Sequence, residues 1–286
     1  MDSIQQPFLA KALLVSVVVG IVCALLSCFM VLKGWSLLGD AISHAVLPGV
    51  VIAYMIGIPF GVGALVFALL AVVIIGFIKA NSKIKEDAAM GIVFTTLFSL
   101  GLILSSRVTS SVNLMHVLFG EILGISDQAA WYTVIVLAIV AAIILLFRRT
   151  FVAFIFDQTH IQSLGLPTTF IHYTLLTLLA VTIVSSLQTV GIILVTAMLI
   201  TPGSTAFLIT KRFVPMLGIA VLTSIFSAVM GVWLSVVYDV SVGGAIVFLQ
   251  GYLFLAVFFY QTWWGVEKEK VEKVAGGLEK RKEVGW

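Results

Sequence analysis

Charged residues are scarce in this chain. They make up 10% of its 286 residues, whereas 61% are hydrophobic, and soluble domains usually carry about 25% charged residues. So few charges cannot cover a water-facing surface, which excludes a soluble globular enzyme. The net charge is only +3, so it gives no argument for nucleic-acid binding.

Cysteine is nearly absent as well. Cys23 and Cys28 are the only two, and both lie in the first apolar run. A spacing of five places them on different faces of a helix. We therefore expect both thiols to pack in an apolar interior, and we expect neither a disulfide nor a metal site from this pair.

Motifs for ATP hydrolysis and for intramembrane hydrolysis are missing. Gly34 and Gly39 have the spacing of P-loop glycines, but Asp40 stands where the phosphate-binding Lys is required. The sequence contains no HExxH zinc motif and no pair of catalytic Asp residues. The chain is therefore not expected to be an enzyme, and any ATP-driven motor must be a separate partner.

Long apolar runs dominate what is present. A membrane-spanning helix needs about 20 mostly apolar residues, and the sequence holds eight or nine such runs. They cover approximately residues 9–32, 41–57, 61–79, 88–105, 129–147, 171–188, 190–210, 215–237 and 243–264. We predict an all-α, polytopic transmembrane bundle with discontinuous helices in residues 1–264. A charged cytoplasmic tail is predicted in residues 265–286.

Basic residues give this bundle an orientation. Clusters of Lys and Arg follow alternate apolar runs, and such clusters mark cytoplasmic loops. They are Lys33, Lys79 to Lys85, Arg148–Arg149 and Lys211–Arg212, whereas Lys11 and Arg107 are lone exceptions on the opposite side. The C-terminus is then cytoplasmic. The N-terminus lies outside if there are nine spans and inside if there are eight.

Two ionisable residues interrupt the second apolar run. Asp40 and His44 are four positions apart, so they share one helix face and lie about 6 Å apart along its axis. Counted from Lys33 at 1.5 Å per residue, His44 lies about 16 Å deep, near the middle of the hydrocarbon core. Ionisable groups at that depth are costly and usually functional. The alternative is a buried Asp–His pair that only locks two helices together.

Two Pro-Gly steps predict interruptions in the helices. Pro48-Gly49 follows the pair closely, and we expect the helix to break there because Pro lacks a backbone donor and Gly loosens the helix. Pro202-Gly203 predicts a second break, about 14 Å from the same membrane edge when counted from Lys211. Interrupted spans at matching depths indicate a transport site.

The chemistry of the pair suits a divalent transition-metal ion, which carboxylate and neutral imidazole ligands bind well. One chain offers only these two side chains, whereas an ion takes four or more ligands. A twofold axis through the pathway would supply two copies of Asp40 and two of His44. This hypothesis predicts a dimer with the site on its axis.

Two other segments carry weaker candidates. His116 and Glu121 lie in the long outer connection between residues 106 and 128. They fit an outer gate or a receptor-docking surface, or else an ordinary surface or packing role. In the cytoplasmic loop, a short helix is predicted from Asp157 to Gly165, and it includes His160. Such a helix could dock another subunit, or it could be an interfacial linker.

Four segments stand in a fixed order along the chain. They are Gly39–Gly49, Leu118–Leu123 (LFGEIL), Phe156–Pro167 and Val195–Ala206 (VTAMLITPGSTA). Together they resemble the permease subunits of ABC importers for manganese, iron and zinc, the ABC-3 family, and the resemblance extends to about residue 260. The segment DAISHAVLPG resembles the manganese/iron branch of this family, and Mn²⁺ is favoured by the resemblance. The ligands by themselves would bind zinc at least as tightly.

The resemblance implies a mechanism and a set of partners. An extracellular solute-binding protein delivers the ion, and two permease subunits, identical or paralogous, form the pathway. Two cytoplasmic ATP-binding-cassette ATPase subunits hydrolyse ATP and push on the loop Asp157–Gly165. Asp40 and His44 match the family's metal positions, with Mn²⁺ favoured over Fe²⁺ or Zn²⁺ as cargo. The family implies the bacterial plasma membrane, no permanently bound cofactor and no nucleic-acid partner.

Two other functions stay open from the sequence. One is a permease of the same architecture for a metal chelate or a vitamin, although such bulky cargo needs a wider polar or aromatic path. The other is a proton-coupled secondary metal carrier that works without an ATPase. Metal uptake by Asp40 and His44 variants tests the first, and reconstitution without an ATPase tests the second.

Overall fold

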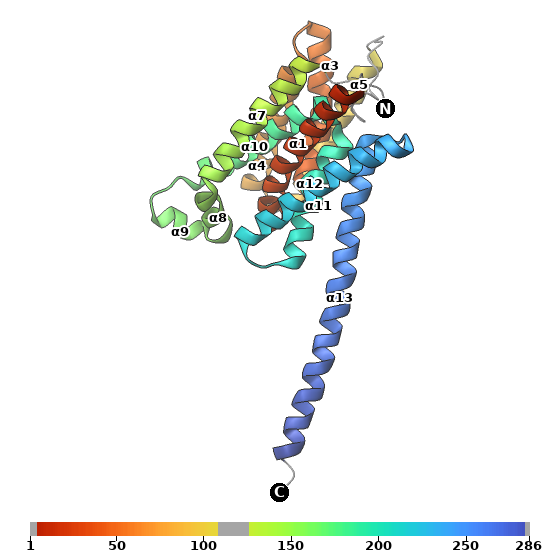
Figure 1. The fold of residues 1–286 in the computed structure, drawn as a ribbon. Helices are drawn as coiled ribbons and strands as arrows, with labels where there is room; N and C mark the ends of the chain where they lie inside the picture. Colours follow the sequence, from red (N-terminus) through yellow and green to blue (C-terminus); the bar gives the residue numbers. More distant parts are fainter. Residues whose placement is uncertain (1–4, 108–125, 284–286) are drawn as a thin grey trace.

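The computed structural model describes residues 5–107 and 126–283, and all regular structure in these ranges is α-helical. The helices in Figure 1 are α1 (Gln5–Lys33), α2 (Leu38–Ala45), α3 (Leu47–Ile56), α4 (Phe60–Asn81), α5 (Glu86–Arg107), α7 (Asp127–Leu146), α8 (Arg148–Phe156), α9 (Gln158–Ser163), α10 (Thr168–Val190), α11 (Ile192–Ile209), α12 (Phe213–Tyr238) and α13 (Val242–Glu283). The predicted all-α fold is confirmed. His116 and Glu121 lie outside the described residues.

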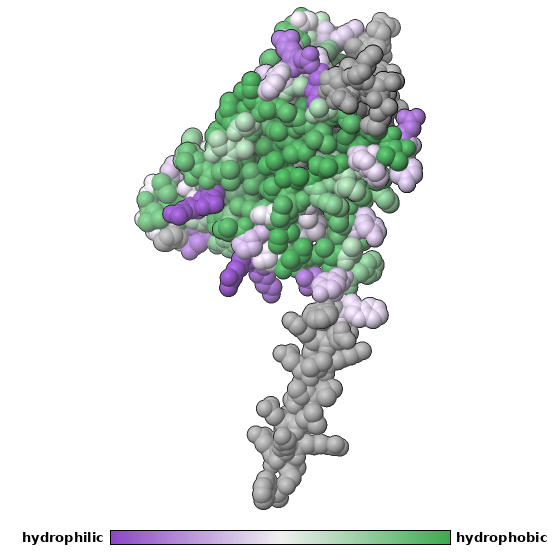
Figure 2. Space-filling model, in the orientation of Figure 1, coloured by the Kyte–Doolittle hydropathy of each residue, from purple (hydrophilic) through white to green (hydrophobic). Residues whose placement is uncertain are grey.

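Nine helical segments of the described chain are long and apolar enough to cross a membrane. α2 and α3 together make one of them, Leu38–Ile56, and α13 supplies the last, Val242–Trp263. Figure 2 shows a broad hydrophobic band across the visible face of the bundle, with hydrophilic residues towards its two ends. Of the two predicted counts, the described chain supports nine spans.

α1 is the central helix of the bundle. It packs against α11 and α12 and also contacts α7, α8 and α10. Val15, Leu26 and Phe29 are fully buried on it, as expected for a helix that is apolar on all sides. Cys23 and Cys28 are buried free thiols in the same core, which confirms their predicted packing role.

The predicted helix break at Pro202 and Gly203 is wrong, because α11 runs without interruption from Ile192 to Ile209. Ser27 of α1 compensates for the irregularity: its hydroxyl accepts the Gly203 N–H at 3.0 Å and donates to the Ile200 carbonyl at 3.2 Å. Hydroxyl side chains commonly satisfy backbone groups that Pro and Gly free in membrane helices. A Cβ on Gly203 would lie 2.5 Å from the Ser27 hydroxyl, so this glycine allows the close helix crossing.

The second span is interrupted beyond His44. α2 ends at Ala45, α3 begins at Leu47, and Val46 lies between them. Pro48 is in the first turn of α3, where its missing N–H costs little. Gly49 has a packing role, since a Cβ there would lie 2.2 Å from the Gly63 carbonyl oxygen. α3 and α4 therefore cross with their backbones in close contact.

Four segments lie at one end of the bundle: the α1–α2 turn, α8, α9 and the α11–α12 turn. We call it the basic end because it contains Lys33, Arg148 and Lys211. Aromatic contacts hold these segments together: the ring of Phe29 on α1 lies 6.0 Å from that of Phe151 on α8 and 5.1 Å from that of Phe213 on α12. Figure 1 shows α8 and α9 projecting there. Hydropathy does not reveal α8, because its nine residues are too few to span a membrane.

Lys11, an exception to the charge pattern, lies near the opposite end. Its Nζ forms an ion pair with a carboxylate oxygen of Asp127, in the first turn of α7. Ser126 caps the same helix by accepting the Ala129 N–H at 3.3 Å. The lone Lys is therefore neutralised locally, which explains why it does not disturb the overall charge pattern.

Candidate functional site

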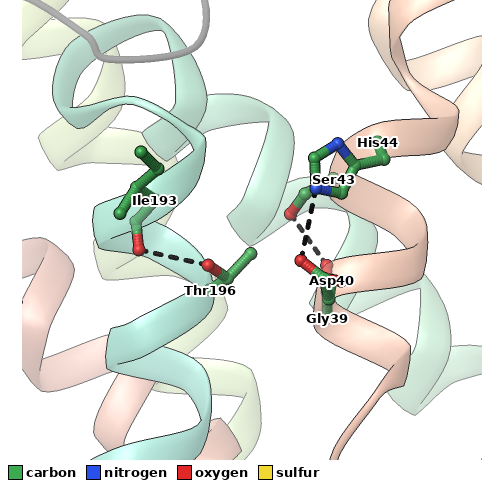
Figure 3. A network of polar contacts seen from close by, with 6 residues as sticks. All are labelled: Gly39, Asp40, Ser43, His44, Ile193 and Thr196. Carbon is green, nitrogen blue, oxygen red and sulfur yellow. Dashed lines mark hydrogen bonds and ion pairs between the residues drawn. The ribbon is translucent and has the colours of Figure 1, made fainter. Parts of the chain in front are cut away.

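Asp40 and His44 lie one turn apart on α2 and point the same way, as the spacing predicts (Figure 3). The His44 Nε2 atom is 3.4 Å from a carboxylate oxygen of Asp40. This exceeds the usual length of a strong hydrogen bond. Two ligand atoms that each lie about 2.1 Å from one ion are about 3.4 Å apart across a tetrahedral angle. The pair is thus spaced to hold a single metal ion between its two atoms.

The imidazole is held by aromatic packing. Its ring lies 5.2 Å from Phe94 and 5.3 Å from Phe98, the second contact being edge-on, and both rings belong to α5. The Nδ1 atom is buried and has no hydrogen-bond partner among the residues of the two described ranges. Metal-binding histidines usually donate this second N–H to an acceptor. Here the two phenylalanines orient the ring and leave Nε2 facing Asp40.

Three helices surround the pair. Ser43, between the two residues, is buried, and its hydroxyl donates to the Gly39 carbonyl of the same helix at 2.7 Å. Across from the pair, Thr196 of α11 faces α2, with its hydroxyl bonded to the Ile193 carbonyl at 3.1 Å (Figure 3). A Cβ on Gly39 would lie 3.2 Å from Leu199, so α2 and α11 pack closely. The site lies between α2, α5 and α11.

The position of the pair along the span differs from the prediction. Residues Gly34–Leu37 form a turn, with Gly34 at φ +77°, so they add no helical rise between Lys33 and α2. His44 is therefore about 9 Å along the helix from Leu38. The count of continuous helical rise from Lys33 is wrong, and the depth of His44 in the membrane stays a prediction. By the same measure Pro202 is about 10 Å from the end of α11 at Ile209. The two positions keep matching levels, but nearer the basic end.

Within the described residues, Asp40 and His44 stand as a pair of possible ligands without a third beside them. The Asp40 side chain is 42% exposed and the His44 side chain 24%, although both lie in a segment apolar enough to span a membrane. No cluster of three or more His, Cys, Asp or Glu side chains occurs in residues 5–107 and 126–283. For this pair to bind an ion, the other ligands must come from beyond these side chains, because an ion needs four or more.

The predicted loop helix is present as α9. Asp157 separates α8 from α9, its carbonyl accepts the Ile161 N–H at 3.3 Å, and Gly165 ends the segment at φ +74°. His160 lies within α9. Ile161 is buried, whereas Gln158 and Gln162 are exposed. α9 thus has one anchored face and one face that is free to contact another molecule.

The sequence did not predict an aromatic cluster that lies at the basic end. Trp35, Phe154 and His172 meet there although they belong to three segments far apart along the chain. Hydropathy places His172 only at the start of a span. No local pattern marks this cluster, because each residue alone resembles an ordinary interfacial aromatic ring.

Comparisons with known proteins agree on one family. The model described as the ABC 3 transport family matches residues 5–261. The chain is 48% identical over 275 residues to the manganese transport system membrane protein MntB of Synechocystis, covering 96% of this chain and 90% of that protein. It is 47% identical to the chelated iron transport system membrane protein YfeD of Yersinia pestis, covering 91% and 87%.

A solved structure is similar over most of its length. The structure titled PsaBC from Streptococcus pneumoniae in complex with Fab superposes with a TM-score of 0.79 at 41% identity. The match covers 88% of this chain and 91% of that one. The helical arrangement described above is therefore shared with that protein.

Proposed function

This chain belongs to the ABC 3 transport family, and from that premise we propose that it carries Mn²⁺ into the cytoplasm of a bacterial cell. It is a multi-pass membrane protein and the permease component of an ABC-type metal transporter. The observation that carries the proposal is the Asp40–His44 pair, with 3.4 Å between its two ligand atoms, partly exposed within a membrane span.

The chemistry of transport follows from the incomplete site. The Asp40 carboxylate offsets part of the charge of a dication, and the neutral His44 imidazole adds a second ligand. A second permease subunit, identical or paralogous, would face the exposed side of α2 and add its own pair. Four ligands from two chains then hold the ion. Separation of the chains removes ligands in steps and releases the ion.

Manganese is supported by the relatives. The MntB protein and two MntC proteins, 43–48% identical to this chain, are named for manganese transport. Other relatives, 46–47% identical, are named for iron or chelated iron. Ligand affinity alone favours zinc over manganese. The DAISHAVLPG segment supports manganese or iron against zinc, and the choice of Mn²⁺ depends on the relatives named for manganese.

The energy source is a separate pair of ATPase subunits at the basic end. The exposed face of α9, with Gln158 and Gln162, is the surface we assign to this partner. An extracellular solute-binding protein delivers the ion at the opposite end. In this arrangement the C-terminal half of α13, which ends at Glu283 and which Figure 1 shows extending away from the bundle, lies in the cytoplasm. The charged tail predicted from residue 265 begins within it.

The test is Mn²⁺ uptake by the complete complex in proteoliposomes supplied with ATP. Asp40→Asn and His44→Ala each remove a ligand, and we expect uptake to fall about tenfold or more. Ser43→Ala is the matched control, since this hydroxyl bonds only its own helix, and uptake should stay normal. Normal uptake by both ligand variants would overturn the proposed site.

The two alternative functions give different results in the same vesicles. A chelate permease would import chelated iron and leave free Mn²⁺ outside. A proton-coupled carrier would import Mn²⁺ under a proton gradient without any ATPase subunit. Uptake of free Mn²⁺ that requires ATP supports the present proposal against both.

A further inference from the structure

α9 and the metal pair are separated along the chain and in space, and the transporter needs a connection between them. α9 contacts α8 and α10, whereas Asp40 and His44 belong to α2. A push on α9 therefore reaches the pair through another segment. The basic end contains one continuous set of contacts that joins the two.

The first contact is at the start of α2. The Trp35 carbonyl accepts the Leu38 N–H at 3.0 Å, so Trp35 is fixed to the first turn of the helix that carries Asp40. Its side chain is 2% exposed. The indole Nε1 is buried and has no hydrogen-bond partner in the described part of the chain. The ring is held by contacts with other side chains, including the Lys33 Nζ, which lies 6.0 Å from the centre of the Trp35 ring.

His172 makes the main aromatic contact. Its ring lies 5.2 Å from the Trp35 ring at 74°, an edge-to-face arrangement, and 6.0 Å from the Phe154 ring of α8. Aromatic rings prefer this geometry, which also fixes their relative orientation. The Lys33 Nζ lies 4.8 Å from the centre of the Phe154 ring. His172 thus joins α8 and α10 to Trp35, which lies in the turn before α2.

The last contact joins this group to α9. The Gln162 side chain of α9 donates to the Thr168 hydroxyl of α10 at 3.4 Å. Thr168 and His172 are four positions apart on α10 and share a helix face. A displacement of α9 therefore moves the first turn of α10, on which His172 stands, and the last turn of α8, on which Phe154 stands.

We infer that His172 is a positioning residue for transport, which couples α9 to the metal pair by holding Trp35 against α8 and α10. This inference rests on the proposed function. When the ATPase partner displaces α9, the Trp35–His172 contact tilts or shifts α2 and thereby changes the spacing of Asp40 and His44 from their counterparts in the second subunit. His172 does not touch the ion.

The experiment measures ATP hydrolysis and Mn²⁺ uptake together, in proteoliposomes that contain the complete complex. His172→Ala should lower the Mn²⁺ imported per ATP by about fivefold, the scale of one lost aromatic pair. Equilibrium binding of Mn²⁺ to the complex should stay unchanged, because Asp40 and His44 are intact. His172→Phe retains a ring and should keep most of the wild-type ratio.

Phe170→Ala is the matched control. It removes an aromatic ring from the same turn of α10, but Phe170 is 69% exposed, so the ratio should equal that of the wild type. If the complex with His172→Ala does not assemble, Trp35→Phe is the second variant. It replaces the indole with a smaller ring at the same contact and should also lower the Mn²⁺ imported per ATP.

The inference is overturned if His172→Ala imports Mn²⁺ per ATP as the wild type does, or if His172→Phe falls as low as His172→Ala. Failure of the proposed function looks different. In that case the wild-type complex imports no Mn²⁺ with ATP, or Asp40→Asn imports it normally.

Discussion

Asp40 is a carboxylate with much of its surface uncovered in an apolar span. An ionised group that faced hydrocarbon there would cost several kcal/mol, so the exposed side requires water or a polar partner. Two ligands from one chain also bind an ion more weakly than the complete set of four. The openness of the pair therefore suits a cargo that must be released, and it disfavours a permanent structural metal.

Ser27 is a polar residue with a structural role, because its hydroxyl forms hydrogen bonds with backbone groups of α11. Ser27→Ala would remove the hydroxyl that accepts the Gly203 N–H and donates to the Ile200 carbonyl, and the net contribution of such a hydrogen bond is about 0.5–1.5 kcal/mol. We expect the free energy of unfolding in detergent to fall by that amount. Ser227→Ala is the control, because its buried hydroxyl bonds only the Thr223 carbonyl of its own helix. Equal stabilities for the two variants would contradict the bridging role.

The two polar sites differ in how far the sequence reveals them. Asp40 and His44 are four positions apart, so helical periodicity alone predicts their shared face. Ser27 and Gly203 are 176 positions apart, and only the packing of α1 against α11 brings them together. The prediction of a break at Pro202 was wrong for this reason, since the sequence shows the lost N–H but not the hydroxyl that compensates.

Among the helices, α3 and α4 make the closest crossing near the site. Gly49→Ala would place a methyl group 2.2 Å from the Gly63 carbonyl oxygen and force the two backbones apart. Such overpacking should lower the free energy of unfolding by about 1–3 kcal/mol, as measured by denaturant or thermal unfolding in detergent.

Gly91→Ala on α5 is the control for this change, because no atom lies within 4 Å of the added Cβ. It should leave stability unchanged or raise it slightly, since Ala favours the helix over Gly. A Gly49→Ala protein as stable as the control would show that α3 and α4 do not depend on this contact.

Hydropathy predicts the positions of most of the long helices, but it does not predict the structure of the segments that connect them. Lipid requires long apolar runs, so all nine spans are evident in the sequence. The turn Gly34–Leu37 and the short helix α8 are not evident, because four residues and nine residues carry too little pattern. The count of helical rise from Lys33 to His44 fails at that turn, since the four residues counted as helix are not helical.

For the molecule as a whole, the helical bundle is confirmed, and the described residues contain nine helical segments long and apolar enough to span a membrane. The orientation of the bundle stays a prediction. Cys23 and Cys28 are 0% exposed and should not react with a membrane-impermeant thiol reagent. We expect Gln128→Cys, at the start of α7, to be labelled in intact cells. Lys211→Cys, at the basic end, should be labelled only after permeabilisation. The reverse labelling pattern would show that the bundle has the opposite orientation. The ATPase partner would then lie at the end of the bundle where α7 begins.

The proposed dimer belongs to the scale of the whole molecule, because the proposal takes half of the ligands from each of two chains. If two copies share one ion, Mn²⁺ should bind to the complete complex at one ion for each pair of permease subunits. Equilibrium dialysis measures this ratio. One tightly bound ion for each single subunit would show that the ligands missing from the described side chains come from the same chain or from water.

The most direct measurement uses the paramagnetism of Mn²⁺ itself. Pulsed electron paramagnetic resonance of the ion bound to the complete complex detects nitrogen nuclei in its coordination shell. The account predicts a nitrogen coupling in the wild type and in Ser43→Ala, and its loss in His44→Ala. An unchanged nitrogen signal from Mn²⁺ bound to His44→Ala would show that the imidazole of α2 does not touch the ion.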